Sequence, residues 1–151
     1  MHPKFKRADE LSRRVIGAAI EVHREKGPGL IESIYEKCLI RELELREIEV
    51  RRQVTVPVEY KGYVFEEDLF LDVLVEDCLI LELKAVEKIL PIHKAQLLSY
   101  MKLMDIPVGL LINFHELRLV DGLHRMMLPG ANLEEDNSED STEGDEGNEE
   151  S

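Results

Sequence analysis

Two carboxylates and one ammonium group lie inside a strongly apolar stretch, residues 69–84. Asp72 is in the first of two apolar runs, and Glu82 and Lys84 are in the second. Burying an ion costs several kcal/mol unless a partner compensates it, so a chain that needed only a core would place Val or Leu here. Two carboxylates and a lysine that meet on adjacent strands suit a divalent cation and a developing negative charge. The residue types therefore predict a metal-dependent phosphodiesterase site.

The spacing of these residues determines whether they can meet. Glu82 and Lys84 are two residues apart, so they project from the same face of their strand. A turn is predicted at Glu76-Asp77, and it brings Asp72 opposite Leu81 or Glu82, depending on the length of the turn. Asp72 and Glu82 can then approach closely enough to share a cation. The alternative interpretation is a buried ion pair between Lys84 and one carboxylate.

The elements that must position these side chains follow from hydrophobic periodicity and turn residues. Helices are predicted over residues 9–26, with Asp9 as the N-cap, over 32–46, and over 91–104, which Pro91 opens. Strands are predicted over 48–60, 63–75, 78–85, 107–114, 118–120 and 124–128. The apolar face predicted for the helix over 9–26 consists of Leu11, Val15, Ala18, Ala19 and Val22. The face predicted for the helix over 32–46 consists of Ile34, Cys38, Leu39, Glu42 and Leu45, and that for the helix over 91–104 of Ala95, Leu98, Met101 and Leu103. This order predicts an α/β fold with a mixed central sheet flanked by helices.

The acidic charge of the chain is concentrated at its C-terminal end. Ten of the 32 Asp and Glu residues lie in residues 131–151, which contain no Lys or Arg, whereas residues 1–130 carry a net charge of about −3. We expect residues 1–130 to form one domain and residues 131–151 to be a disordered acidic tail, because the tail is almost without apolar residues. The total charge of −13 argues against nucleic acid, but the nearly neutral body neither supports nor forbids a phosphate ligand.

The cysteines and the apolar runs bear on the compartment. Cys38 and Cys78 are expected to be free buried thiols rather than a disulfide, and no close Cys/His pair supports a zinc site. No apolar run reaches membrane-spanning length, and no hydrophobic stretch follows the basic residues near the N-terminus. Neither a membrane partner nor a secretory signal is expected, and cytoplasm is the default location.

Three motifs, in this order and spacing, resemble those of a known family. Asp72 with Glu82-Leu83-Lys84 is similar to the D…(D/E)-x-K signature of the PD-(D/E)XK nuclease superfamily, with Leu71 in place of the proline. The segment Gly29-Leu30-Ile31-Glu32-Ser33-Ile34-Tyr35 resembles the motif of the GxxExxY family, a branch of that superfamily. Gln96-Leu97-Leu98-Ser99-Tyr100 resembles the QxxxY element of RecB-like nucleases. The resemblance covers residues 10–128 and implies a restriction-endonuclease-like αβββαβ core, which matches the elements predicted over 32–114.

The resemblance implies a role for each residue of the predicted metal site. Asp72 and Glu82 are expected to be metal ligands, the Leu83 carbonyl to supply a third oxygen, and Glu32 to complete the set directly or through water. Magnesium or manganese suits such all-oxygen ligation. Lys84 is expected to orient the attacking water or to stabilise charge on the scissile phosphate. The alternative for Glu32 is a carboxylate that the dipole of its helix favours.

The resemblance also implies residues that line the substrate site. Gln96 and Tyr100 are four apart, share a helix face and are expected to touch nucleic acid or the lysine, and Tyr35 is expected to pack beside Glu32. The alternatives are a solvent-facing Gln96, a half-buried Tyr100, and a Tyr35 that serves only core packing. Further contacts to phosphate are conceivable for Arg51, Arg52, Lys61 and Lys94, although solvated charges explain these residues equally well.

The expected function is a metal-dependent nuclease-like protein that hydrolyses nucleic-acid phosphodiester bonds, with DNA favoured over RNA. The alternative is a non-catalytic nucleic-acid-binding or protein-interaction module, because a fold is not a function. The intact set of Asp72, Glu82 and Lys84 disfavours loss of catalysis. A third possibility is a complex with a larger protein partner that supplies specificity, because the chain has no helicase, methylase or evident DNA-reading domain.

Overall fold

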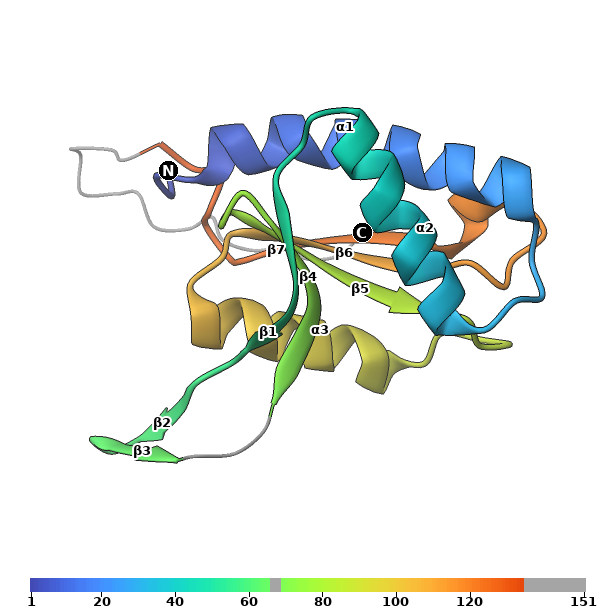
Figure 1. The fold of residues 1–151 in the computed structure, drawn as a ribbon. Helices are drawn as coiled ribbons and strands as arrows, with labels where there is room; N and C mark the ends of the chain where they lie inside the picture. Colours follow the sequence, from blue (N-terminus) through green and yellow to red (C-terminus); the bar gives the residue numbers. More distant parts are fainter. Residues whose placement is uncertain (66–68, 135–151) are drawn as a thin grey trace.

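A five-stranded sheet lies between helices, and a separate two-stranded hairpin extends from it (Figure 1). The computed structural model describes residues 1–65 and 69–134. The helices are α1 (Phe5–Lys26), α2 (Glu32–Leu45), α3 (Pro91–Met104) and the short 3₁₀ helix η1 (Leu119–Gly122). The strands are β1 (Val50–Thr55), β2 (Val58–Tyr60), β3 (Tyr63–Phe65), β4 (Phe70–Val75), β5 (Leu79–Lys84), β6 (Val108–Asn113) and β7 (Leu123–Met127).

The sheet is mixed, and its strand order is β1-β4-β5-β6-β7. β4 pairs antiparallel with β1 and with β5, and β7 pairs antiparallel with β6. β5 and β6 are parallel, so the chain must cross over between them, and α3 makes that connection. The path α2-β1-β4-β5-α3-β6 confirms the predicted αβββαβ core and fits the restriction-endonuclease-like fold.

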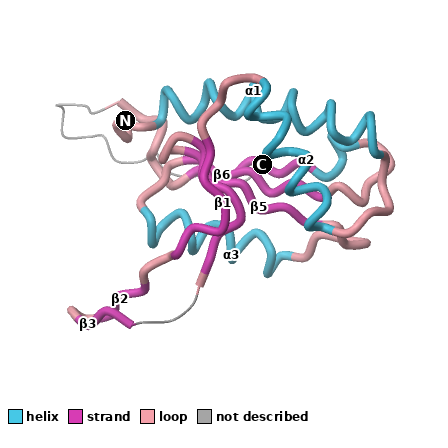
Figure 2. The backbone as a smooth tube through the Cα atoms, in the orientation of Figure 1, coloured by secondary structure: helices cyan, strands magenta, loops and turns pink. Residues whose placement is uncertain are grey.

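Two apolar cores lie on opposite faces of the sheet. α1 and α2 cover one face, where Leu11, Tyr35 and Leu39 pack against Leu81, and α3 covers the other (Figure 2). On that second face Ile80 packs against residues of α3. Because side chains alternate along a strand, Glu82 and Lys84 lie on the same face of β5 as Ile80. The active-site candidates on β5 therefore face the α3 side of the sheet.

The helices differ from their predicted boundaries and faces in several places. α1 begins at Phe5, so Asp9 lies inside the helix and is not its N-cap; it pairs with Arg13 and Arg125 instead. The predicted apolar face of α1 is confirmed, since all five of its residues are buried. The face predicted for α2 is correct at Leu39 but wrong at its ends, because the helix buries Tyr35, Glu36, Leu39 and Leu43 and leaves Ile34 and Leu45 exposed. α3 has the predicted bounds, but it buries Leu97, Tyr100 and Met101, whereas Ala95 and Leu103 are exposed.

Two predicted strands are interrupted. The strand predicted over 48–60 breaks at Val56-Pro57, and β2 leaves the sheet to pair with β3. Proline lacks a backbone donor and cannot continue the ladder, which explains the break. The strand predicted over 63–75 is correspondingly split into β3 and β4. The short strand predicted at 118–120 is wrong, because this segment belongs to η1, where the Asp121 N–H donates to the Arg118 carbonyl.

The remaining predictions concern cysteines, membranes and the tail. Both cysteines are free; Cys78 is buried, whereas Cys38 is only half-buried. Within residues 1–65 and 69–134, no helix combines the length and apolarity needed to cross a bilayer. Ala131 is buried and its carbonyl accepts a hydrogen bond from the His2 N–H at 2.8 Å. The acidic tail was predicted over 131–151, so its first residue is packed against the body, and the tail lies outside the described residues from position 135 onward.

Candidate active site

The turn between β4 and β5 sets the register of the predicted site. Glu76 and Asp77 both have positive φ, 48° and 58°, and the Cys78 N–H donates to the Val75 carbonyl. These features define a tight turn of type I′, at the predicted position. The strands then pair Val73 with Leu81 and Val75 with Leu79. Continuing this register places Asp72 opposite Glu82, which decides between the two partners that the sequence left open.

The ladder between β4 and β5 ends where these two carboxylates meet. Asp72 Oδ2 accepts a hydrogen bond from the Leu83 N–H at 2.9 Å, so a side chain occupies the place of a strand carbonyl. Figure 1 shows β4 and β5 diverging beyond this point. Glu82 is only 7% exposed, and its Oε2 atom is buried with no hydrogen-bond partner in the described part of the chain. A buried carboxylate oxygen without a donor calls for a cation or a proton.

Three carboxylates and one ammonium group share the electrostatic field of this site. The pKa of Glu82 is raised to about 9, first by burial and then by the negative charge of Asp72, while Lys84 opposes the shift. Burial also raises the pKa of Glu32, with Asp72 adding to the shift and Lys84 opposing it. The structure therefore brings Glu32 to the site from α2, together with Asp72, Glu82 and Lys84. We call Glu32, Asp72 and Glu82 the acidic cluster.

Tyr35 holds the start of α2, and hence Glu32, in place. It is fully buried, and its hydroxyl donates to the Gly27 carbonyl and accepts from the Leu30 N–H at 3.1 Å. Gly27, at φ 68°, adopts the left-handed backbone that this loop requires. These contacts agree with the packing alternative for Tyr35 and give it a positioning role beside Glu32.

A chain of contacts connects the α2 side of the site with the end of β5. The Tyr35 ring stacks on Phe114, with centroids 4.5 Å apart and planes 9° from parallel. The Phe114 N–H in turn donates to the Lys84 carbonyl at 2.9 Å. The backbone N–H of Phe114 thus holds the end of β5, and the ring of the same residue packs on Tyr35, which anchors the start of α2.

Asn113 fixes the segment that follows Lys84, and sequence reasoning did not identify it. This residue is fully buried beside Lys84 in the β5–β6 register. Its amide donates to the Val86 carbonyl at 2.9 Å, and its Oδ1 atom accepts from the Val86 N–H at 3.1 Å. The sequence feature that could have identified Asn113 is its position as a lone polar residue at the end of an apolar strand.

A second missed group lies one helical turn after Glu32. Glu36 is buried, and its Oε2 atom accepts from Arg52 Nε at 3.0 Å and Arg52 Nη2 at 2.9 Å. Gln53, which the register places across from Asp72, also donates to Glu36 at 3.4 Å and has an unusual φ of 50°. The sequence feature that could have identified Glu36 is its spacing of four residues from Glu32, which puts both side chains on one face of α2. This group ties α2 to the strand beside Asp72.

Gln96 and Tyr100 are brought together as their spacing predicts. Gln96 Nε2 donates to the Tyr100 hydroxyl at 3.1 Å. Tyr100 is on the buried face of α3, whereas Gln96 is exposed. They lie on the helix that covers the Glu82 face of the sheet, and their observed hydrogen bond is with each other.

The donor set fits a magnesium or manganese ion that is completed by water and substrate. Among residues 1–65 and 69–134, no three His, Cys, Asp or Glu side chains already form a metal cage. Magnesium does not need one, because it keeps several waters and uses one or two carboxylates plus substrate phosphate. Asp72 and Glu82 provide those carboxylates, and the unpartnered Glu82 Oε2 atom provides a position for the cation. The residues present therefore fit the metal that the sequence predicted.

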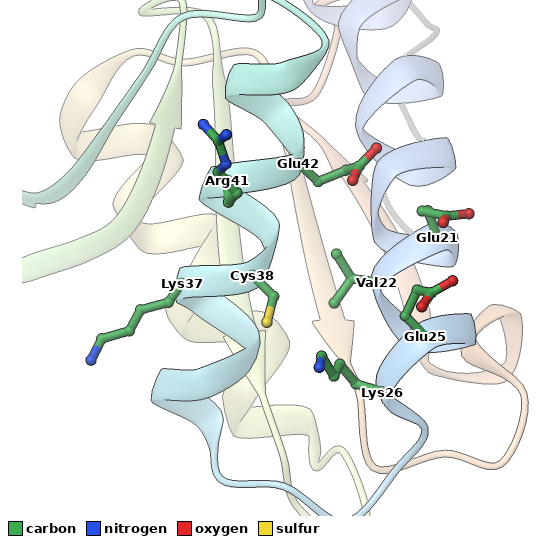
Figure 3. Close-up of a pocket in the computed structure, with 8 residues that line it drawn as sticks. All are labelled: Glu21, Val22, Glu25, Lys26, Lys37, Cys38, Arg41 and Glu42. Atoms are coloured by element: carbon green, nitrogen blue, oxygen red, sulfur yellow. The ribbon is translucent and has the colours of Figure 1, made fainter.

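A pocket elsewhere on the molecule does not belong to this site. Its volume is about 340 Å³, and it lies between α1 and α2 (Figure 3). Its lining is largely charged and includes Val22 and Cys38, but none of the predicted site residues. It gives no support for a second catalytic centre.

Comparison with known proteins agrees with the fold and the motifs. A family model described as the PD-(D/E)XK nuclease superfamily matches residues 9–126, a range that contains the acidic cluster, Lys84, Gln96 and Tyr100. No curated protein and no solved structure matches the chain. Because the match covers more than half of the chain, the protein belongs to the PD-(D/E)XK nuclease superfamily.

Proposed function

We propose that this protein is a magnesium- or manganese-dependent nuclease of the GxxExxY branch, and that DNA is its preferred substrate. The observation that carries the proposal is the cross-strand pair of the half-buried Asp72 and the buried Glu82, with one Glu82 oxygen lacking a partner within the described residues. A structural ion pair would give that oxygen a donor. A metal site leaves it open for a cation.

Each residue of the site has a distinct part in the proposed reaction. Asp72, Glu82 and the Leu83 carbonyl hold the ion, and Glu32 contributes directly or through water. A bound divalent cation supplies activation of the attacking water and offsets charge on the phosphate oxygens. Lys84 places an ammonium group where negative charge develops in the transition state.

The substrate side of the proposal involves α3 and the cluster on α2. Gln96 is exposed while its partner Tyr100 is anchored in the core, so the amide is held in position to contact nucleic acid. Arg52 is half-exposed and its orientation is set by Glu36, which suits it to contact a phosphate close to Asp72. Tyr35 acts by positioning Glu32 and does not contact substrate.

Protonation of Glu82 links metal binding to pH. With a pKa raised to about 9, Glu82 holds a proton at neutral pH in the metal-free protein. Metal ligands must be deprotonated, so ion binding is expected to release this proton. Affinity for magnesium should accordingly rise with pH between about 7 and 9.

The rival function is a non-catalytic nucleic-acid-binding or protein-interaction module, and one experiment separates the two. Magnesium binding is measured by calorimetry on the wild type, Asp72→Ala and the control Asp121→Asn, beside cleavage of mixed DNA and RNA substrates. Asp121 is exposed, so its substitution removes one carboxylate outside the site. Metal binding and cleavage that are lost only in Asp72→Ala support the nuclease. Wild-type protein that binds nucleic acid without magnesium uptake or cleavage supports the module. Two further expectations stay predictions: a protein partner that supplies substrate specificity, and a cytoplasmic location.

A further inference from the structure

The hairpin of β2 and β3, residues Val58–Phe65, projects from the body of the protein, and we call it the arm (Figures 1 and 2). It leaves the sheet after the break at Val56-Pro57. Lys61 and Gly62 form its tip, with φ values of 52° and 82°. Glu59 Oε2 accepts a hydrogen bond from the Gly62 N–H at 2.6 Å, which closes the turn. The arm is therefore a formed hairpin with a defined register.

One face of the arm carries three exposed aromatic rings. The register pairs Val58 with Phe65 and Tyr60 with Tyr63, so these four side chains share a face. Tyr60, Tyr63 and Phe65 are exposed by 62%, 66% and 41%, and the Tyr63 and Phe65 rings are 4.9 Å apart. An isolated two-stranded hairpin is marginal in water, so an aromatic face held open in this way indicates a ligand that covers it.

The size of this face argues against a second copy of the chain as that ligand. An aromatic side chain buries about 200 Å² when fully covered, so the exposed parts of the three rings offer roughly 340 Å². Two arms packed face to face would bury about 700 Å² in total, well below the roughly 1,200 Å² that stable protein interfaces need. Stacking with nucleic-acid bases has no such threshold, because each stacked base adds binding energy of its own.

The position of the arm relative to the acidic cluster fits a nucleic-acid strand that reaches both. Gln53 lies across from Asp72, and Tyr60 follows seven residues later along the same chain segment. At about 3.3 Å per residue this separation is at most about 23 Å. A stacked strand advances about 3.4 Å per nucleotide, so roughly seven nucleotides span it.

The charge of the arm indicates that stacking, rather than phosphate attraction, provides the affinity. Lys61 lies at the tip with its Nζ atom 5.3 Å from the centroid of the Tyr60 ring, which leaves one cation beside the aromatic face. The acidic residues 66–68 follow the arm in the sequence. The contribution of the arm itself should therefore depend weakly on salt, with a slope close to that of a single phosphate contact.

We propose that the arm is a stacking platform for unpaired bases, and that the substrate strand is single-stranded where it leaves the acidic cluster. This inference rests on the proposed nuclease function and adds the substrate class to it. Tyr60, Tyr63 and Phe65 hold the bases, and Lys61 contacts the adjoining phosphate. A base pair in a duplex does not expose its faces, so duplex DNA cannot use the platform.

The test measures binding of the full chain in EDTA, where no cleavage occurs, by fluorescence anisotropy. The probes are labelled oligothymidylate of about 20 nucleotides and a duplex of equal length. The double variant Tyr60→Ile, Tyr63→Ile keeps an apolar, strand-favouring face without rings, and Tyr60→Phe, Tyr63→Phe keeps the rings. Leu117→Ala, at a residue exposed by 85%, is the control for loss of a surface apolar group.

We expect the wild type, the Phe variant and the control to bind the single strand more tightly than the duplex. The Ile variant should bind the single strand at least tenfold more weakly and the duplex unchanged. Equal single-strand affinity of the Ile variant and the wild type would overturn the role of the arm. So would sedimentation that shows a dimer dissociating in the Ile variant with no preference for single strands, since the arm would then be a protein interface.

Different results would refute the proposed nuclease function and the proposed stacking platform. Cleavage in magnesium that persists in Asp72→Asn would refute the nuclease site without changing any affinity measured in EDTA. Conversely, Asp72-dependent cleavage together with unchanged binding of the Ile variant would refute only the stacking platform.

Discussion

Replacement of Glu82 by Gln should stabilise the metal-free protein at neutral pH. The folded-state pKa of about 9 lies above the ordinary value of 4.5, so the folded protein binds more protons than the unfolded chain between these values. The stability that the proton on Glu82 gives the folded protein is fully present below about pH 4.5, falls as pH rises, and is gone above about pH 9. Gln carries no titratable proton and avoids this loss.

The pKa shift gives the size of the effect. Each pKa unit corresponds to about 1.36 kcal/mol, so at pH 7 the ionisation linkage of Glu82 costs at most about 3 kcal/mol of unfolding free energy, and below 1 kcal/mol at pH 5. For a chain of this length, 3 kcal/mol corresponds to roughly 6–12 °C in Tm. The gap between Glu82→Gln and the wild type should therefore widen as pH rises from 5 to 7.

The assay is thermal and urea denaturation in EDTA at several pH values, with Glu25→Gln as the matched control. Glu25 is an exposed glutamate of α1, so its variant should show a constant, small difference from the wild type. Added magnesium should raise the Tm of the wild type and leave Glu82→Gln unchanged, because the variant lacks a ligand. A variant that melts below the wild type at pH 7 in EDTA would refute the reasoning and support a structural ion pair with Lys84.

The other predictions concern the remaining parts of the site and the tail. Asp72→Ala should destabilise the metal-free protein by about 1–3 kcal/mol relative to Asp72→Asn, which can still accept the Leu83 N–H; equal melting curves would contradict this. Lys84→Ala should abolish cleavage and leave calorimetric magnesium binding largely intact, because the lysine acts on transition-state charge; full activity would point to another site or a contaminant. Tyr35→Phe should cost roughly 1–2 kcal/mol and lower kcat with little change in KM, as expected for a residue that positions Glu32; unchanged kcat would leave it a core residue only. A chain ending at Glu134 keeps the buried Ala131 and tests whether the acidic tail, which spans about 23 Å as a coil, competes with phosphate. Tighter nucleic-acid binding at low salt, with the gain shrinking above 0.1 M, is the expected result of competition, and equal affinities indicate a merely solubilising tail.

The elements that position the site could be predicted because each has a local signal. Pro91 marks the start of α3, and the apolar runs of β5 and β6 are bounded by turn residues. The turn at Glu76-Asp77 lies where it was predicted, but the length of the connection decides whether Asp72 faces Leu81 or Glu82, and the observed register places it opposite Glu82. Local rules determined this part of the site because the strands are adjacent in the sequence.

The parts that could not be predicted depend on contacts between distant segments. α2 presents two similar apolar stripes, and the choice of the stripe with Tyr35 follows from stacking on Phe114, which is far away in the sequence. The role of Asn113 requires the loop at Val86 to return to β6. The two strands of the hairpin arm were predicted as the ends of two longer strands, 48–60 and 63–75, because the alternating pattern carries no signal, apart from Pro57, that β2 and β3 separate from the main sheet.

The acidic cluster destabilises the fold that carries it, and the surrounding contacts explain how it persists. A partnerless Glu82 oxygen and a carboxyl with a pKa near 9 store unfavourable free energy in the metal-free state. Tyr35, Phe114 and Asn113 anchor the backbone beside Glu32 and Lys84 with buried stacking and hydrogen bonds that do not depend on the metal. Such contacts hold Glu32 and Lys84 at fixed positions although three acidic side chains are crowded together. The site is thus organised before a cation binds, so cation binding carries no additional free-energy cost for ordering the strands.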